Sequence, residues 1–156
     1  MLIDLLGEQR IEVLSDNLID PLFESLVILE AMGDLRDEGI DWKTVDSILH
    51  VSAGRNRLMS ELIVLFGESS SQNISEMKRS IARGNSNEVK AFAHAMKSVC
   101  GSIGARRAQS IAAEIENTNQ SFKANEVLKF VESLENEIRQ SIATLKVFVA
   151  NRANPS

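Results

Sequence analysis

The chain has 156 residues, 44% of them hydrophobic, and a net charge of −5. This length corresponds to one domain, and its hydrophobic content suffices for a core. The acidic balance argues against nucleic-acid binding, which usually accompanies a basic surplus. Aromatic residues make up only 4%, and the chain has 8 glycines and 2 prolines. We therefore expect an aliphatic core between helices.

The sequence also indicates where the protein acts. Cys100 is the single cysteine, which excludes an internal disulfide framework and fits a reducing compartment. No apolar run approaches the roughly 20 residues of a membrane span. Residues 1–6 contain an early Asp and no basic segment, unlike a secretory signal. We expect a cytoplasmic protein without membrane insertion.

The N-terminal third is predicted to be helical but irregular. Residues 1–15 are expected to form a short helix or an arm, and apolar spacing predicts a helix over residues 17–33. Asp41 has the pattern of an N-cap for a helix over residues 42–50, which Gly54 then ends.

A longer helix is predicted over residues 57–82. The Ser- and Asn-rich stretch at residues 68–73 leaves a break open, because such side chains compete for the backbone. The expected core residues of this helix are Leu58, Leu62, Leu65, Phe66, Ile74, Met77 and Ile81.

The next helix begins after a clear turn at residues 84–86. Asn85 and Glu88 have the spacing of a capping box, and Gly104 marks the following turn. Apolar residues recur between them at spacings of three and four, as on one face of a helix. These are Val89, Phe92, Ala93, Met96, Val99, Cys100 and Ile103.

Two further amphipathic helices complete the chain. The first is predicted over residues 105–117 and the second over residues 126–150, capped by Asn125. The second has an apolar seam of Val127, Phe130, Val131, Leu134, Ile138, Ile142, Leu145 and Val149. Short connections between long helices predict antiparallel neighbours. We expect an all-α fold: an antiparallel up-down four-helix bundle over residues 56–151, with additional N-terminal helices in an extension or linker over residues 1–55 that packs on it.

His94 is the most informative residue, because it points away from the apolar face of its helix. Its neighbours on the helix surface are Lys90, Ala91, Lys97, Ser98 and Gly101. Three are small, two are cationic and none is a carboxylate, whereas ordinary surfaces favour long charged side chains. Gly101 costs roughly 1 kcal/mol in a helix, which a flat surface for a close partner would explain. The alternative is an ordinary solvated histidine.

The run Ala-His-Ala-Met-Lys-Ser around His94, followed ten residues later by Gly104, resembles the signature of histidine phosphotransfer (HPt) domains. These are the phosphorelay modules of bacterial two-component systems. Lys97 and Ser98 match the family pattern, and Met96 replaces its usual Leu, a volume-conserving change. The run from Ser98 is similar to C-terminal modules of hybrid sensor kinases. The resemblance implies a four-helix bundle that carries a phosphoryl group.

The resemblance also assigns the site. His94 becomes the phosphorylated nucleophile, Lys97 stabilises the phosphoryl oxygens, and Gly104 is a structural motif residue. A partner-binding surface is expected at Lys90, Ala91, Ala95, Ser98, Gly101 and Ser102. Since a free imidazole is largely neutral near pH 7, His94 can attack without a dedicated base. The implied partners are response-regulator receiver domains, which supply an aspartyl phosphate and Mg²⁺, and a hybrid sensor kinase; no cofactor or metal is expected in this chain.

Other functions find less support. No CxxC, HExxH, GxSxG or P-loop pattern occurs, and no ATP-binding motif accompanies His94, so we expect a phosphoryl carrier and not a kinase. The alternatives are a helical adaptor that binds a signalling partner without transfer and, least favoured, an enzyme using His94 as a general base. We expect His50 to be a packed or surface residue, Cys100 to be structural, and Arg106 and Arg107 to be solvated.

Overall fold

The computed structural model describes residues 38–118 and 123–153. Within these ranges the chain is helical and contains no strand, which confirms the expected all-α class. The segments predicted at residues 1–15 and 17–33 lie outside the described residues. The described helices are α4 (Trp42–Val51), α5 (Asn56–Ala82), α6 (Ser86–Ile103), α7 (Arg106–Glu116) and α8 (Ala124–Ala153).

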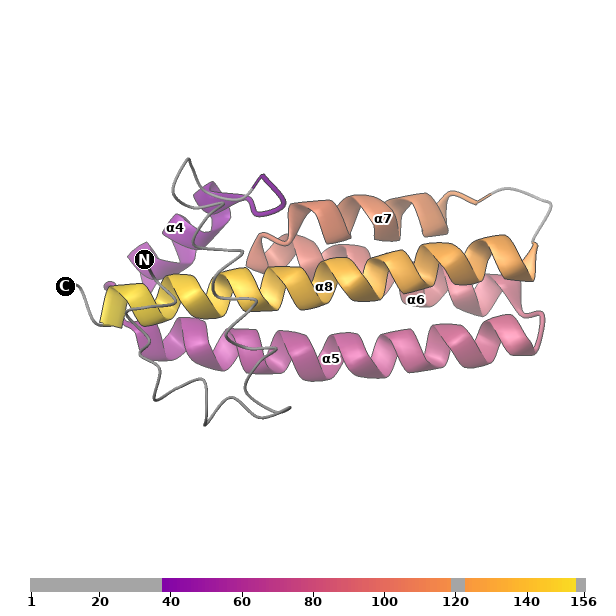
Figure 1. Ribbon diagram of the computed structural model, residues 1–156, viewed down its shortest axis with the longest axis horizontal. Helices are drawn as coiled ribbons and strands as arrows, with labels where there is room; N and C mark the ends of the chain where they lie inside the picture. The colour runs from indigo at the N-terminus through magenta and orange to yellow at the C-terminus, as the bar shows by residue number, and fades with distance from the viewer. Residues whose placement is uncertain (1–37, 119–122, 154–156) are drawn as a thin grey trace, which may run out of the picture. The chain divides into compact units, whose positions relative to one another are not determined.

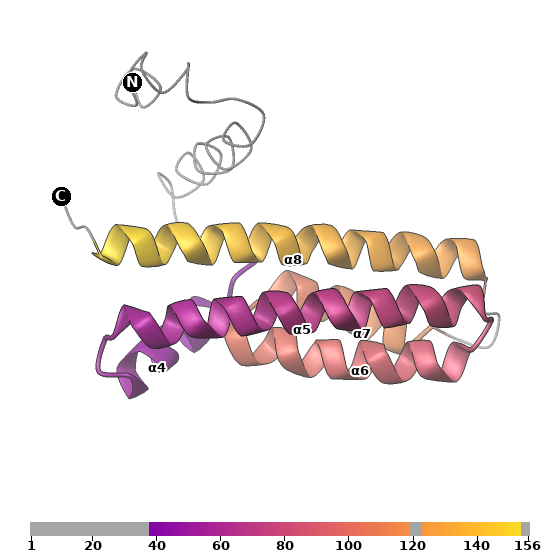
Figure 2. The same ribbon diagram turned by 90° about the horizontal axis from the view of Figure 1, so that it is seen from below.

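Four of these helices form an antiparallel up-down bundle, as expected (Figure 1). α5 contacts α6, α6 contacts α7, α7 contacts α8, and α8 returns to α5. Figure 2 shows α5 and α8, the two longest helices, running side by side along the bundle. α7 is much shorter: it starts beside the C-terminal end of α6, lies over the middle of the bundle and ends well short of the α5–α6 turn (Figure 1).

α4 packs against α5 and α6 at the other end of the bundle. It buries Val45 and Leu49, and Trp42 contacts the Phe148 ring of α8 with 5.0 Å between ring centroids. α4 therefore belongs to the same compact unit as the bundle, although it lies within the segment that we assigned to the extension.

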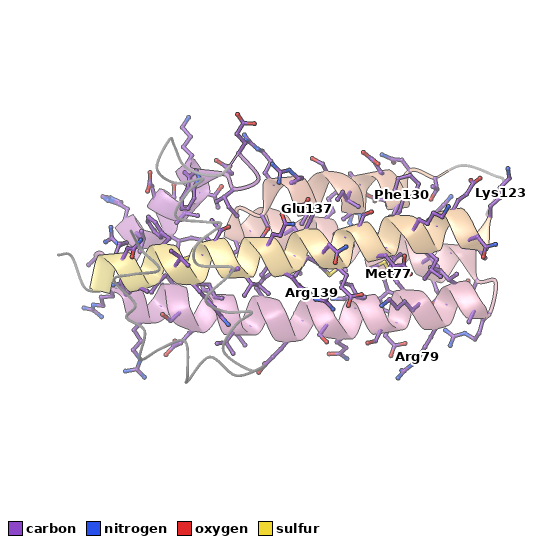
Figure 3. All side chains as sticks on the ribbon, viewed as in Figure 1. Met77, Arg79, Lys123, Phe130, Glu137 and Arg139 are labelled. Carbon is purple, nitrogen blue, oxygen red and sulfur yellow. The ribbon has the colours of Figure 1, made fainter. Side chains whose placement is uncertain are left out.

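The core is aliphatic, as the composition predicts, but the helical phase of α5 differs from our expectation. Leu58 and Leu65 are exposed, and Met59 and Ile63 are buried in their place. α5 packs between α6 and α8, so its buried stripe is centred on Phe66, and Leu65 faces outward. Figure 3 shows the same contrast further along α5, where Met77 lies inside the bundle and Arg79 projects outward.

α5 is continuous through the stretch where a break was left open. Phe66 and Ile74 on either side of this stretch are both buried at helical spacing, which keeps the helix in register. Asn73 donates a hydrogen bond from its side chain to the Ser69 carbonyl at 2.9 Å. The Asn73 side chain thus bonds to its own helix without interrupting it, whereas the buried Ser70 hydroxyl of the same stretch has no hydrogen-bond partner among the described residues.

The helix starts were predicted with mixed success. Asp41 accepts a hydrogen bond from the Lys43 amide, so it caps α4 as expected. Asn85 likewise accepts from the Glu88 amide, but the Glu88 carboxylate bonds Ser80 and Arg83 instead of completing the capping box. The cap predicted for the last helix is wrong, because α8 already begins at Ala124.

The N-terminal end of α4 is attached to the turn between α6 and α7. The Asp41 amide donates to the Gly104 carbonyl at 2.7 Å, and the Arg107 amide donates to the Gly39 carbonyl at 3.1 Å. The Arg106 guanidinium donates to the Glu38 carbonyl at 2.5 Å. Arg107 also pairs with a carboxylate of α8, so the expectation that both arginines are simply solvated is wrong.

Candidate functional site

His94 lies near the middle of α6 with its side chain 63% exposed. The opposite face of α6 is buried at Val89, Met96 and Ile103, and half-buried at Phe92 and Val99. The exposure of His94 that the spacing of the apolar residues predicts is thus confirmed, although two of the seven apolar residues on the other face, Phe92 and Val99, are only half-buried.

A carboxylate from α7 lies against His94. Glu116 Oε1 is 2.5 Å from His94 Nδ1, and Glu116 Oε2 is 2.6 Å from Lys97 Nζ. The Glu116 side chain is only 22% exposed, less than either partner. One carboxylate group therefore contacts both residues that the sequence placed in the site.

Glu116 is held in its anionic form. The Lys97 ammonium, and after it the His94 ring, lower the pKa of the Glu116 carboxyl below its usual value of 4.5. Both partners favour the charged form of the carboxylate, and they outweigh the opposing effect of partial burial. Near neutral pH the site therefore contains a carboxylate that can only accept hydrogen bonds.

Reasoning from α6 alone missed Glu116, since none of the surface neighbours of His94 on its own helix is a carboxylate. The sequence signal that could have found Glu116 is the number of residues that separate it from the turn between α6 and α7. His94 and Glu116 are symmetric about Ala105, eleven residues on either side. In an antiparallel pair of helices, residues equidistant from the turn lie side by side, because both helices rise about 1.5 Å per residue.

Gly101 is explained by the same pairing. A Cβ atom at Gly101 would lie 2.6 Å from Nε2 of Gln109, and these two residues are also symmetric about Ala105. The missing side chain lets α7 approach α6 closely. Our expectation that Gly101 serves a flat open surface is therefore wrong as an account of its packing: its Cα faces a neighbouring helix of the same chain.

The other side of His94 is open and consists of small residues. Ala91, Ser98 and Ser102 are exposed, and Ala95 is half-buried. The two hydroxyls bond carbonyls of their own helix: Ser98 Oγ donates to His94 O at 3.4 Å, and Ser102 Oγ to Val99 O at 2.7 Å. Lys90, on the α7 side of His94, is half-buried.

An apolar groove adjoins these small residues. Its cavity measures about 190 Å³ and runs between α5 and α6. Leu65 forms part of its rim and is 58% exposed. We call this feature the α5–α6 groove; it is lined by Leu62, Leu65, Phe66, Ser69, Val99, Ser102 and Ile103.

The remaining motif residues have structural environments. Gly104 ends α6 with φ of 86°, a left-handed conformation that suits glycine, and a Cβ there would lie 2.8 Å from the Asp41 carbonyl oxygen. Burial raises the pKa of the Cys100 thiol to about 12, which makes it unreactive, as expected. His50 is exposed at the end of α4.

The described residues contain neither a metal-binding cluster nor a helix suited to span a membrane. No group of three or more His, Cys, Asp or Glu side chains in residues 38–118 and 123–153 is arranged to hold a metal ion. None of the helices that the structure describes combines the length and the apolar character needed to cross a membrane.

One family matches the chain, over a range that covers most of the bundle. The profile of the Hpt domain matches residues 61–147, more than half of the chain, and this range includes His94, Lys97 and Glu116. No curated protein and no solved structure gave a significant match. Hpt domains are helical phosphocarrier modules of phosphorelays and not autonomous kinases. With an exposed histidine on a bundle helix and this match over its surroundings, the chain belongs to the Hpt domain family.

Proposed function

We propose that this protein is a phosphorelay carrier that accepts a phosphoryl group on His94 from the aspartate of a receiver domain and passes it to another receiver domain. The observation that carries the proposal is the exposed ring of His94 beside Lys97, within the range matched by the Hpt domain. A cytoplasmic location is part of the proposal.

The transfer step needs only one nucleophile from this chain. A ring nitrogen of His94 attacks the phosphorus of the aspartyl phosphate, an N–P bond forms, and the P–O bond to the aspartate breaks. The electron pair of that bond leaves with the receiver carboxylate. The receiver supplies Mg²⁺, and Lys97 supplies a cation for the phosphoryl oxygens.

The docking surface lies on the α5 side of His94. Residues Ala91, Ala95, Ser98 and Ser102 present no long side chain there, so a receiver domain can bring its phosphoaspartate to the ring. The adjoining α5–α6 groove and exposed Leu65 add an apolar contact surface. Lys90 and Gly101 stay in the proposed surface at its α7 edge, where contact with the partner is more restricted.

The competing function is a helical adaptor that binds a signalling partner without transfer. An adaptor requires the docking surface and does not require His94. The two functions therefore predict different results when His94 is substituted. A carrier loses its activity, whereas an adaptor still binds its partner.

The test is a transfer experiment with a purified receiver domain charged by acetyl phosphate. We expect an acid-labile, alkali-stable phosphoryl group to appear on the chain. His94→Gln should abolish it while changing the free energy of unfolding by only about 0.5 kcal/mol, because the ring is exposed. His50→Gln is the matched control and should transfer normally. Transfer at the wild-type rate in His94→Gln would refute the proposal.

A further inference from the structure

A cavity between α5 and α8 is not used by the proposed function. It measures about 210 Å³, and we call it the α5–α8 cavity. We propose that it binds a short ω-hydroxycarboxylate, whose carboxylate lies against Lys78 and Arg139 and whose hydroxyl lies against Ser70. Binding there does not involve His94. The residues that line the cavity include Ser70, Ile74 and Lys78 of α5 and Glu135, Ile138 and Arg139 of α8.

The spacing of three residues on α5 gives the cavity a polar end, an apolar middle and a charged end. Ser70, Ile74 and Lys78 recur every four residues, so they lie on one stripe of the helix, about one turn apart. From Ser70 to Lys78 the stripe is about 12 Å long. Ile74 and Ile138 are both buried and supply the apolar middle. The cavity therefore suits a ligand with an apolar body and a polar group at each end.

The polar end contains a buried hydroxyl without a partner. Ser70 is 1% exposed, and its Oγ has no hydrogen-bond partner among the described residues. Such a group has lost its hydrogen bonds to water without gaining others, which lowers stability. Rotation about the Cα–Cβ bond of Ser70 redirects the hydroxyl without moving the helix. A ligand hydroxyl can donate to Oγ or accept from it and, unlike a carboxylate, brings no charge into this end.

The charged end has one surplus positive charge. Lys78 Nζ donates to Glu135 Oε2 at 2.6 Å, and Arg139 donates to Glu135 Oε1 at 2.8 Å, so two cations share one carboxylate. An ammonium and a guanidinium have several N–H donors each, which leaves donors for a second carboxylate. The side chains of Lys78 and Arg139 are 42% and 67% exposed, against 27% for Glu135. An incoming carboxylate therefore meets the cations more readily than Glu135.

The size of the cavity limits the ligand to a short chain. At the roughly 30 Å³ that one water molecule takes in the liquid, the cavity holds about seven non-hydrogen atoms. A four-carbon ω-hydroxycarboxylate has this size, and its extended chain with a hydrogen bond at each end spans about 12 Å. The α5–α6 groove lies on a different side of α5, so a bound ligand leaves the proposed docking surface free.

The test is a ¹H–¹⁵N NMR titration of the full chain with 4-hydroxybutyrate, 5-hydroxypentanoate and 6-hydroxyhexanoate at constant ionic strength. We expect saturable shifts confined to residues 67–78 and 135–142 with at least one of these compounds. For each chain length the matched ligands are the carboxylate without the hydroxyl and the diol without the carboxylate. The first should bind about fivefold more weakly and the second about tenfold more weakly.

Two variants assign the ends of the ligand. Ser70→Ala removes a hydroxyl that has no partner, so it should fold, and it should weaken binding of the hydroxycarboxylate about fivefold without affecting the plain carboxylate. Arg139→Gln should weaken both about tenfold, since a charge-assisted contact is lost. Ser133→Ala and Arg79→Gln are the controls and should bind like the wild type, because Ser133 is exposed and Arg79 projects outward from α5 (Figure 3).

The inference is overturned if none of the three compounds gives saturable shifts at these residues, in which case the cavity holds only water. It also fails if Ser70→Ala weakens the plain carboxylate as much as the hydroxycarboxylate, or if Arg139→Gln binds like the wild type. Shifts that spread over the exposed cations of the whole surface and do not saturate would show nonspecific anion binding and would equally refute it.

Discussion

The two sides of α6 that flank His94 differ in how they are occupied. On the α7 side, Lys97 and Gly101 are in contact with Glu116 and Gln109 of the neighbouring helix. On the α5 side, Ala91 and Ser98 face an open surface that continues into the α5–α6 groove. The closed side thus joins α6 to α7 through side-chain contacts, and the open side is the one on which we propose that the partner docks.

The largest expected effect concerns the turn that brings α7 back beside α6. Gly104→Ala should lower the free energy of unfolding by about 3 kcal/mol, because alanine is strained at positive φ and its Cβ would meet the Asp41 carbonyl oxygen. Gly84→Ala is the matched control: its φ is also positive, but a Cβ there meets nothing within 4 Å. It should cost only about 1 kcal/mol. Chemical denaturation measures the free energy of unfolding of both variants. Equal losses in the two would show that the contact between Gly104 and α4 does not contribute to stability.

On the open side, Ser98→Arg should weaken binding of the receiver domain at least about tenfold, equal to roughly 1.4 kcal/mol. A long side chain would stand where the partner must approach the ring, and Ser98 is exposed, so folding should be unaffected. Titration calorimetry measures the affinity. Ser133→Arg, on an exposed position of α8, is the control and should bind normally. Normal binding by Ser98→Arg would place the docking surface elsewhere.

On the closed side, Lys97→Ala should slow phosphoryl transfer about three- to tenfold, since one charge-assisted contact to the phosphoryl oxygens is lost. The variant should keep the stability of the wild type within about 1 kcal/mol, because its ion pair with Glu116 is partly exposed. Rapid-quench measurements of transfer give the rate. An unchanged rate and an unchanged phosphohistidine lifetime would remove Lys97 from the chemistry.

The contact between Gly101 and Gln109 can be tested as a double-mutant cycle. Gly101→Ala alone should change stability little, because the gain in helix propensity is offset by displacement of the Gln109 side chain. In a Gln109→Ala background the same substitution should stabilise the protein by about 1 kcal/mol. Thermal unfolding measures the difference. Identical effects in both backgrounds would show that the helices are not in close contact here.

The smallest effect concerns acid stability. The pKa of Glu116 is lowered by Lys97 and His94, and that of Glu88 by Arg83 and Ser80, both from a usual value of 4.5. A carboxyl with a lowered pKa in the folded state stabilises the protein above its unfolded pKa and loses that effect as the pH falls. Stability should therefore be constant above about pH 5 and decline below 4.5. The stability of Glu116→Gln should fall less than that of the wild type as the pH is lowered. Identical profiles of stability against pH for the two proteins would contradict the pairing of Glu116 with Lys97 and His94.

The sequence predicted those features that depend on residues close together in the chain. Apolar spacing and caps are local, and they predicted the bundle, the exposure of His94 and the caps at Asp41 and Asn85. The phase of α5 was wrong at Leu65, because which face is buried depends on the two helices that pack against it.

The closed side of the site depends on a longer-range relation. Glu116 is distant from His94 in sequence, and only the register of two helices brings them together. The attachment of Asp41 to Gly104 connects still more distant segments, and no local pattern signals it. The histidine and lysine were therefore predictable from a motif, whereas their carboxylate partner was not.

The symmetry of two residue pairs about Ala105, His94 with Glu116 and Gly101 with Gln109, has a consequence for changes in chain length. Surface turns usually tolerate insertions. One residue added between Gly104 and Ala108 would move α7 along α6 by about 1.5 Å and rotate it by about 100° relative to the turn. Glu116 would then leave His94, and Gln109 would leave Gly101, with every side chain of the site unchanged. The number of residues in this turn is thus itself a determinant of the site.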